Sequence, residues 1–165
     1  MERNTDMLGA IELAMEAENK AHDFYRKGAE VTEHPQGKEL FLQLADFEKS
    51  HYNYLKKLHD SLSGSGQYIE YGGTSFSKSG IETRGEIEGE PKKDEVIDIL
   101  NMAIEAERKE QKRYADLAKQ TTDSSGQKMF KKLSEEEGLH LRILNDEFYN
   151  LTNRGGWGSK SLWSE

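Results

Sequence analysis

The sequence predicts an all-α protein folded as a four-helix bundle, and three observations support that prediction. Apolar residues recur every three or four positions through four long segments, as they do on the buried face of an amphipathic helix. The chain is 34% hydrophobic and 33% charged, which suits helices with solvated outer faces better than a buried parallel sheet. The second pair of segments repeats the first at a constant offset of 89 residues, which indicates an internal duplication.

The helix boundaries follow from turn and capping residues. Thr5 or Asp6 is a candidate N-cap for the first helix, and Asp94 is one for the third. Pro35 suits the first position of the second helix, because its fixed φ angle matches a helix start. Thr121 to Gly126 forms the turn before the fourth. We therefore expect helices over residues 5–32, 35–62, 92–120 and 123–151.

Residues 63–91 differ in kind from the helical segments. They contain seven Gly and five Ser and have no helical period, so we expect a long connection, with a short extended piece at Tyr68–Tyr71. Such a segment is long enough to run from one end of the bundle to the other. Two helical hairpins joined by a long crossover give a ferritin-like bundle. The chain is expected to be a single domain, residues 1–165, with a tail at 152–165.

Polar residues interrupt the apolar face of the second helix. Between Leu44 and Leu55, the positions facing the core are Glu48 and His51. Burying such a pair costs several kcal/mol unless something compensates it, and a metal ion is the natural partner. The 89-residue offset converts the pair into Glu137 and His140.

Two further glutamates, Glu18 and Glu107, are related by the same offset. In an antiparallel hairpin, residues equidistant from the turn lie at one height, and this places each glutamate beside the Glu-x-x-His of its own hairpin, about 22 Å from the bundle end. Four carboxylates balance the charge of two divalent cations, and this ligand pattern is typical of di-iron and di-manganese carboxylate bundles. The predicted metal ligands are Glu18, Glu48, His51, Glu107, Glu137 and His140.

Through these residues, together with Tyr25 and Tyr114, the four helices resemble the rubrerythrin family. The resemblance implies two iron ions, with manganese or a mixed pair as the alternative, and reduction of hydrogen peroxide to water. It also implies a further ligand at Glu110, which binds one iron in the oxidised state; the first helix has Ala21 there. The hydroxyls of Tyr25 and Tyr114 are expected to orient ligand carboxylates.

Many rubrerythrins carry a rubredoxin domain with cysteine ligands, but this chain has no cysteine. Its electrons are therefore expected from an external donor such as a rubredoxin-like protein. The absence of cysteine also excludes disulfides, thiolate catalysis and iron–sulfur ligation.

The net charge of −8 argues against a nucleic-acid partner. No apolar run approaches the length of a membrane span, and the N-terminus lacks the apolar region of a signal peptide. We therefore expect a cytoplasmic protein without a membrane partner. The family resemblance and a tail containing Trp157 and Trp163 favour a homodimer, with the tail covering a bundle end or a subunit contact.

Three alternatives to the peroxidase stay open. The same ligands would serve a ferroxidase that oxidises ferrous iron with dioxygen, or a di-manganese centre with catalase-like chemistry. They would also serve a bundle that binds metal without catalysis. Outside the site, Glu16 and Glu105 are expected to face solvent, and His22, His34 and His59 to have surface or packing roles.

Overall fold

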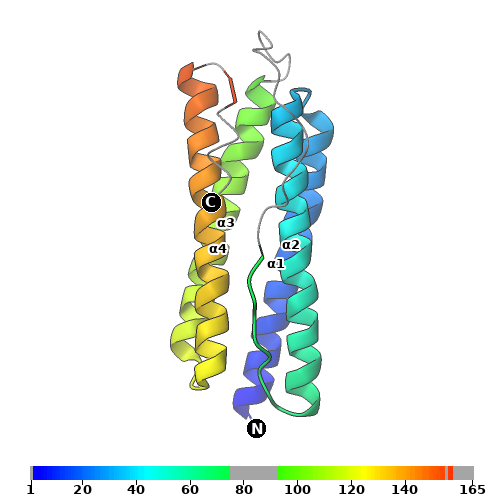
Figure 1. Ribbon diagram of the computed structural model, residues 1–165, viewed down its shortest axis with the longest axis vertical. Helices are drawn as coiled ribbons and strands as arrows, with labels where there is room; N and C mark the ends of the chain where they lie inside the picture. The colour runs from blue at the N-terminus through cyan, green and yellow to red at the C-terminus, as the bar shows by residue number, and fades with distance from the viewer. Residues whose placement is uncertain (1, 75–92, 155, 158–165) are drawn as a thin grey trace.

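The computed structural model describes residues 2–74, 93–154 and 156–157. Four α-helices follow one another in this part of the chain, and the all-α four-helix bundle is confirmed (Figure 1). A short π-helical turn, η1, follows the last of them. The bounds are Glu2–Val31 for α1, Pro35–Gly64 for α2, Lys93–Gln120 for α3, Ser124–Tyr149 for α4 and Asn150–Arg154 for η1.

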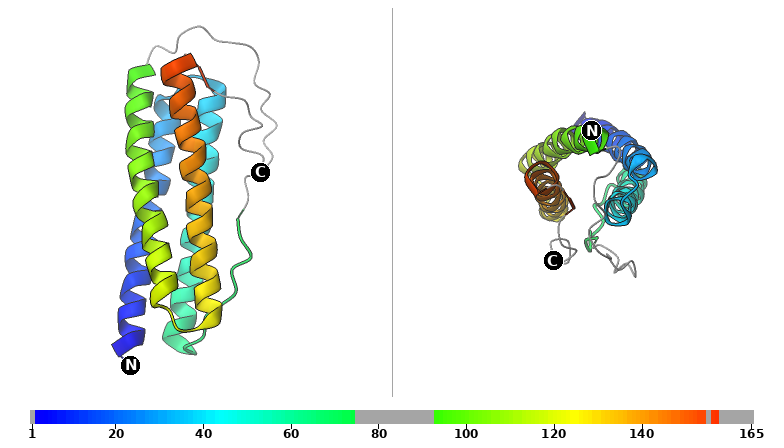
Figure 2. Two further views of the ribbon diagram at one scale, coloured as in Figure 1. Left: turned by 90° about the vertical axis from the view of Figure 1, so that its left-hand side faces the viewer. Right: turned by 90° about the horizontal axis from the view of Figure 1, so that it is seen from above.

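The helices are arranged as two antiparallel hairpins. In each hairpin the two helices pack along their whole length, α1 with α2 and α3 with α4. The hairpins meet through α1 and α3, which lie side by side (Figure 2). This order brings the inner faces of all four helices toward one axis.

The two hairpin turns are built in the same way. The hydroxyl of Thr32 donates to the carbonyl oxygen four residues earlier at 2.7 Å, and Thr121 does the same at 2.6 Å. Each following helix then begins with a side-chain cap: His34 Nδ1 accepts from a backbone N–H of α2, and Asp123 accepts from one of α4. These bonds satisfy backbone groups that a helix end leaves without partners.

Several predicted boundaries were wrong by a few residues. Helix α1 begins at Glu2, so Thr5 and Asp6 lie inside the helix and do not cap it. Helix α3 begins at Lys93, which places Asp94 within its first turn. The fourth helix ends at Tyr149 and continues as η1, where a regular helix to residue 151 was expected.

The first part of the crossover packs against the bundle. Tyr68–Tyr71 forms no strand in the described region, so the expected extended piece has no ladder. Instead, the Tyr54 hydroxyl of α2 donates to the carbonyl oxygen of Ile69 at 2.7 Å, and the rings of Tyr54 and Tyr71 lie 4.6 Å apart. Residues 75–91 of the predicted crossover lie outside the described residues, as do residue 92 and Trp163.

The apolar core is divided into two clusters. One surrounds Phe41 and Leu144 near the hairpin turn of α1 and α2, and it includes the half-buried ring of Trp157. The other surrounds Leu55 and Phe130 near the turn of α3 and α4. The layer between them contains buried glutamates and histidines. Among the described helices, none is both long and apolar enough to cross a membrane.

Candidate metal centre

The six predicted ligands meet in the polar layer between the two apolar clusters. They come from all four helices, and each has 2% or less of its surface exposed. Glu18 lies on α1, Glu48 and His51 on α2, Glu107 on α3, and Glu137 and His140 on α4. The height argument made from the sequence thus agrees with where the side chains lie.

The six side chains form two overlapping groups. One consists of Glu18, Glu48, His51 and Glu137, and within it the candidate ligand atoms all lie within 4.8 Å of one another. The other group, defined by the same distance, consists of Glu48, Glu107, Glu137 and His140. Glu48 and Glu137 belong to both groups, so they are the two carboxylates that two bound metal ions would share.

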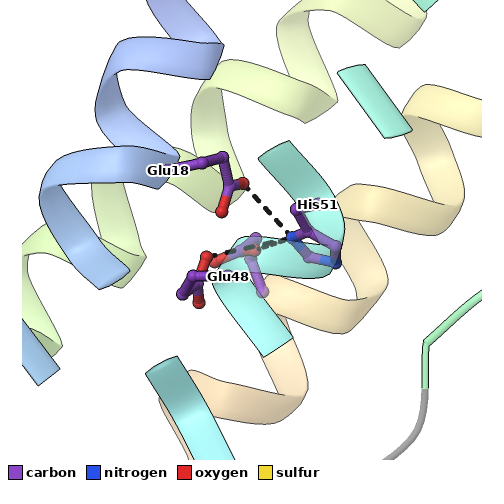
Figure 3. Close-up of side chains that lie close together, drawn as sticks. Glu18, Glu48 and His51 are labelled. Carbon is purple, nitrogen blue, oxygen red and sulfur yellow. Dashed lines mark hydrogen bonds and ion pairs between the residues drawn. The ribbon is translucent and has the colours of Figure 1, made fainter. Parts of the chain in front are cut away.

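Both histidines turn Nδ1 toward the carboxylates. His51 Nδ1 lies 3.2 Å from Glu18 and 2.8 Å from Glu137 (Figure 3 shows His51 with Glu18 and Glu48). His140 Nδ1 lies 2.9 Å from Glu48 and 3.5 Å from Glu107. The same ring nitrogen therefore faces the site in both halves.

The charges of this cluster are not balanced by the protein. Burial raises the pKa of Glu48 and Glu137 well above the ordinary value, and neighbouring carboxylates raise it further. Burial acts on the pKa of Glu18 in the same direction, but the charge of His51 and the hydrogen bonds with Glu48, His51 and Tyr114 together outweigh it and lower that pKa. Protons and imidazolium charge are thus needed to keep these carboxylates in the core when no metal is bound.

The donor set fits a pair of divalent cations. Four buried carboxylate oxygens of the six ligands have no hydrogen-bond partner among the described residues: Oε2 of Glu18, Oε2 of Glu107 and both oxygens of Glu137. Buried polar atoms are rarely left in this state without a ligand. Oxygen and imidazole donors suit iron and manganese, and four carboxylates neutralise two divalent ions.

Two tyrosines connect the hairpins through this layer. The Tyr25 hydroxyl of α1 donates to Glu107 of α3 at 2.6 Å, and the Tyr114 hydroxyl of α3 donates to Glu18 of α1 at 2.6 Å. Burial and the nearby carboxylates raise the pKa of both phenols well above its ordinary value, so they remain protonated donors. Each tyrosine therefore orients a carboxylate that belongs to the opposite hairpin.

Glu110 lies next to the six ligands but outside both groups. It is buried, and its Oε1 accepts from Arg113 Nε at 3.1 Å. Burial raises its pKa to about 7, against the lowering effect of Arg113, and the charges of Glu18 and Glu107 add to the increase. The expected additional ligand thus faces a cation on its own helix.

The remaining residues named from the sequence lie outside the site. Glu16 and Glu105 are exposed, as expected. His22 Nδ1 lies 3.1 Å from Asp23 Oδ1, and His59 Nε2 lies 2.8 Å from Glu12 Oε1 on the neighbouring helix. His34 is the N-cap of α2.

The sequence interpretation missed Glu136. This residue has 8% of its surface exposed, and its Oε1 lies 2.8 Å from His51 Nε2. It also accepts from the Tyr71 hydroxyl, and from the backbone N–H of Thr74 at 2.8 Å. Burial would raise its pKa, but these hydrogen bonds lower it, so the carboxylate is ionised. The only signal in the sequence is the departure from the repeat, since Phe47 occupies the corresponding position in α2.

Known proteins give a consistent assignment. A solved structure of a hypothetical protein from Pyrococcus furiosus shares 25% identity with the chain, covers 88% of it and 89% of its own length, and superposes with a TM-score of 0.69. No curated protein matches the chain. The family model described as Rubrerythrin matches residues 2–87 and 98–154. With most of its length matched and the buried carboxylate–histidine layer in place, the chain belongs to the rubrerythrin family.

Proposed function

We propose that this protein reduces hydrogen peroxide to water at a di-iron centre, with electrons supplied by a separate donor protein. The observation that supports the proposal most directly is the pair of overlapping ligand groups that share Glu48 and Glu137. Two carboxylates shared in this way would hold a pair of metal ions close enough to act on both oxygens of one small molecule. Membership of the rubrerythrin family supports the same reading.

The metal pair, when bound in its ferrous form, would supply the two electrons that cleave the O–O bond. The chain itself holds the ligands in place, since all six are buried between apolar clusters that limit the entry of water. Tyr25 and Tyr114 fix the orientation of Glu107 and Glu18. These contacts would preserve the site while the charge of the metal pair changes.

Glu110 has two roles in this proposal. In the metal-free chain, burial raises its pKa to about 7; when it is not a ligand, its carboxyl group would hold one of the protons that conversion of peroxide to water consumes. The family resemblance also gives it the role of a ligand in one oxidation state. Its ion pair with Arg113 offers a position to occupy when it is not a ligand.

The test begins with metal content and anaerobic loading. The chain loaded with Fe(II) should hold two irons, and its oxidation by peroxide should be faster than its oxidation by dioxygen, followed by absorbance in a stopped-flow instrument. Glu48→Ala and His140→Ala should abolish stoichiometric iron binding, whereas Glu105→Gln, on the exposed face of α3, should not. Faster oxidation by dioxygen would support a ferroxidase, and a preference for manganese would replace the iron chemistry altogether.

The electron donor and the oligomeric state belong to the same proposal. A rubredoxin-like protein should reduce the oxidised centre in a mixture of the two purified proteins. Sedimentation equilibrium should give twice the mass of the 165-residue chain if the expected homodimer forms. Failure of every one-electron donor to restore the ferrous state would contradict turnover with peroxide.

A further inference from the structure

Glu136 is a buried carboxylate that belongs to neither ligand group. Both of its oxygens accept hydrogen bonds: Oε1 from the Tyr71 hydroxyl and His51 Nε2, and Oε2 from the Thr74 backbone N–H. It therefore joins α4 to α2 and to the first part of the crossover. We name residues 67–74 the crossover strap.

The strap is shaped to reach Glu136. Gly73 has a φ of +90°, in the left-handed region that favours glycine. A Cβ atom at this position would lie 3.3 Å from Glu136 Oε2 and 3.1 Å from Lys132, so a side chain there would crowd the carboxylate. The strap is also held on α2, where the Tyr54 hydroxyl donates to Ile69 and the Tyr54 ring packs on Tyr71.

The contact with Glu136 determines how His51 faces the site. An imidazole ring has two nitrogens, and Glu136 at 2.8 Å from Nε2 keeps a proton on that nitrogen. The lone pair for a metal ion is then on Nδ1, which lies 2.8 Å from Glu137. A carboxylate behind a ligating histidine fixes its tautomer and ring orientation and makes it a stronger ligand.

The second hairpin supplies Glu136 to His51 of the first hairpin, but the first hairpin supplies no equivalent carboxylate to His140 of the second. All six proposed ligands repeat at the 89-residue offset, but Glu136 corresponds to Phe47. The Phe47 ring lies 4.1 Å from the ring of His140, between ring centres. A phenyl ring carries no formal charge and supplies no carboxylate oxygen. The two halves therefore match in these six ligands and differ in the residue placed behind the histidine.

We propose that Glu136, anchored by the strap through Tyr71 and Thr74, is a positioning residue that makes the two metal positions unequal. It orients His51 and adds negative charge behind it, so the position formed with Glu18 and His51 binds a divalent cation more tightly than the position formed with Glu107 and His140. The inference rests on the metal centre of the proposed function and is independent of the reaction with peroxide.

The experiment is a Co(II) titration of the full-length, chelator-treated protein, followed by visible absorbance. The native chain should bind two ions in two resolved steps. Glu136→Leu should weaken the tighter step by about 10- to 100-fold, the usual range when a partner of a ligating histidine is lost, and leave the weaker step nearly unchanged. Glu136→Gln should have a smaller effect, because its amide oxygen still accepts the Nε2 proton.

Two further variants separate positioning from folding. Tyr71→Phe removes one anchor of Glu136 while leaving every proposed ligand and Glu136 itself in place, and it should weaken the same step. Glu135→Gln, an adjacent and exposed change of the same charge, should alter neither step. In the Zn(II)-loaded protein, nitrogen-15 NMR of histidine should show His51 protonated at Nε2, and exchange of that proton with water should accelerate in Glu136→Leu.

Each outcome decides the proposal. The proposal is supported if only the tighter binding step weakens, and if it weakens more in Glu136→Leu than in Glu136→Gln. Three results would overturn it and leave the proposed peroxidase intact. The first is equal weakening of both binding steps, and the second is no weakening in either Glu136→Leu or Tyr71→Phe. The third is a native chain whose two binding steps cannot be distinguished. A native chain that binds no metal overturns both. If Glu136→Leu fails to fold by circular dichroism, Tyr71→Phe and Glu136→Gln decide alone.

Discussion

Replacing Glu110 by Gln should stabilise the metal-free protein, and the gain should grow as the pH rises. Glu110 is buried beside Glu18 and Glu107, and Arg113 offsets only part of the cost of its charge. Its pKa is accordingly raised from 4.5 to about 7. Glutamine keeps the size and polarity of the protonated carboxyl group and cannot ionise.

The sign and size of the effect follow from this shift. Below pH 4.5 Glu110 is protonated in the folded and unfolded chain alike, so ionisation contributes nothing. As the pH rises toward 7, the unfolded chain loses the proton first, and the folded state is progressively destabilised. At 1.36 kcal/mol per pKa unit, the destabilisation amounts to about 1 kcal/mol at pH 5.5 and about 3 kcal/mol at pH 8.

The assay is urea unfolding of chelator-treated protein at both pH values, followed by circular dichroism. The advantage of Glu110→Gln over the native chain should increase by about 2 kcal/mol between pH 5.5 and pH 8. Glu105→Gln is the matched control, because Glu105 pairs with Arg108 at the same spacing and distance, 3.1 Å, on the exposed face of the same helix. That control should change stability by less than about 1 kcal/mol at either pH. An advantage that is constant or falls with pH would show that Arg113 dominates and would refute the reasoning.

Three further predictions concern the site and its frame. Tyr25→Phe and Tyr114→Phe should each lower the free energy of unfolding by about 1–3 kcal/mol in urea titrations, because a buried carboxylate loses a donor; unchanged stability in both would contradict the cross-hairpin bonds. Co(II) at 100 times its dissociation constant should add about 2.7 kcal/mol per site to the free energy of unfolding, measured by thermal melts. Ca²⁺ prefers six to eight oxygen ligands and should stabilise the protein far less. Equal stabilisation by the two ions would exclude a histidine-containing site. Gly37→Ala should destabilise by about 1–3 kcal/mol and change tryptophan fluorescence, because its Cβ would lie 2.3 Å from the Trp157 ring. Gly9→Ala, with nothing within 4 Å, should stabilise by about 0.5–1 kcal/mol, and the reverse order of these two variants would contradict the packing.

The helical arrangement and the convergence of the six buried residues followed from the sequence because both depend on local, repeated rules. Helical periodicity identifies the inner face, and equal distance from a turn sets the height in an antiparallel hairpin. Glu18 and Glu48 satisfy both rules, and the 89-residue offset repeats them in the second hairpin. No knowledge of the tertiary structure was needed for that step.

These local rules could not predict the burial of Glu136 or its contact with Tyr71. Glu136 lies one residue from Glu137, about 100° around the helix, where an outward direction is the ordinary expectation. It is buried because the crossover strap covers it, and the strap has no period from which its path could be deduced. The ion pair of Glu110 with Arg113 was also not predicted. The spacing of Glu110 from Glu107 indicates a metal ligand, but Arg113 lies three residues later on the same helix and pairs with it.

The hydrogen bonds from Tyr25 to Glu107 and from Tyr114 to Glu18 have a consequence for how such a site can diversify. The tyrosine of each hairpin orients a glutamate of the other hairpin and not its own, so a working centre requires two hairpins together. If two identical hairpins associated as separate molecules, any substitution would appear in both of them. Joining them in one chain removes that restriction. Glutamate at 110 opposite alanine at 21, and glutamate at 136 opposite phenylalanine at 47, are differences that a symmetric ancestor made of two identical chains could not have held.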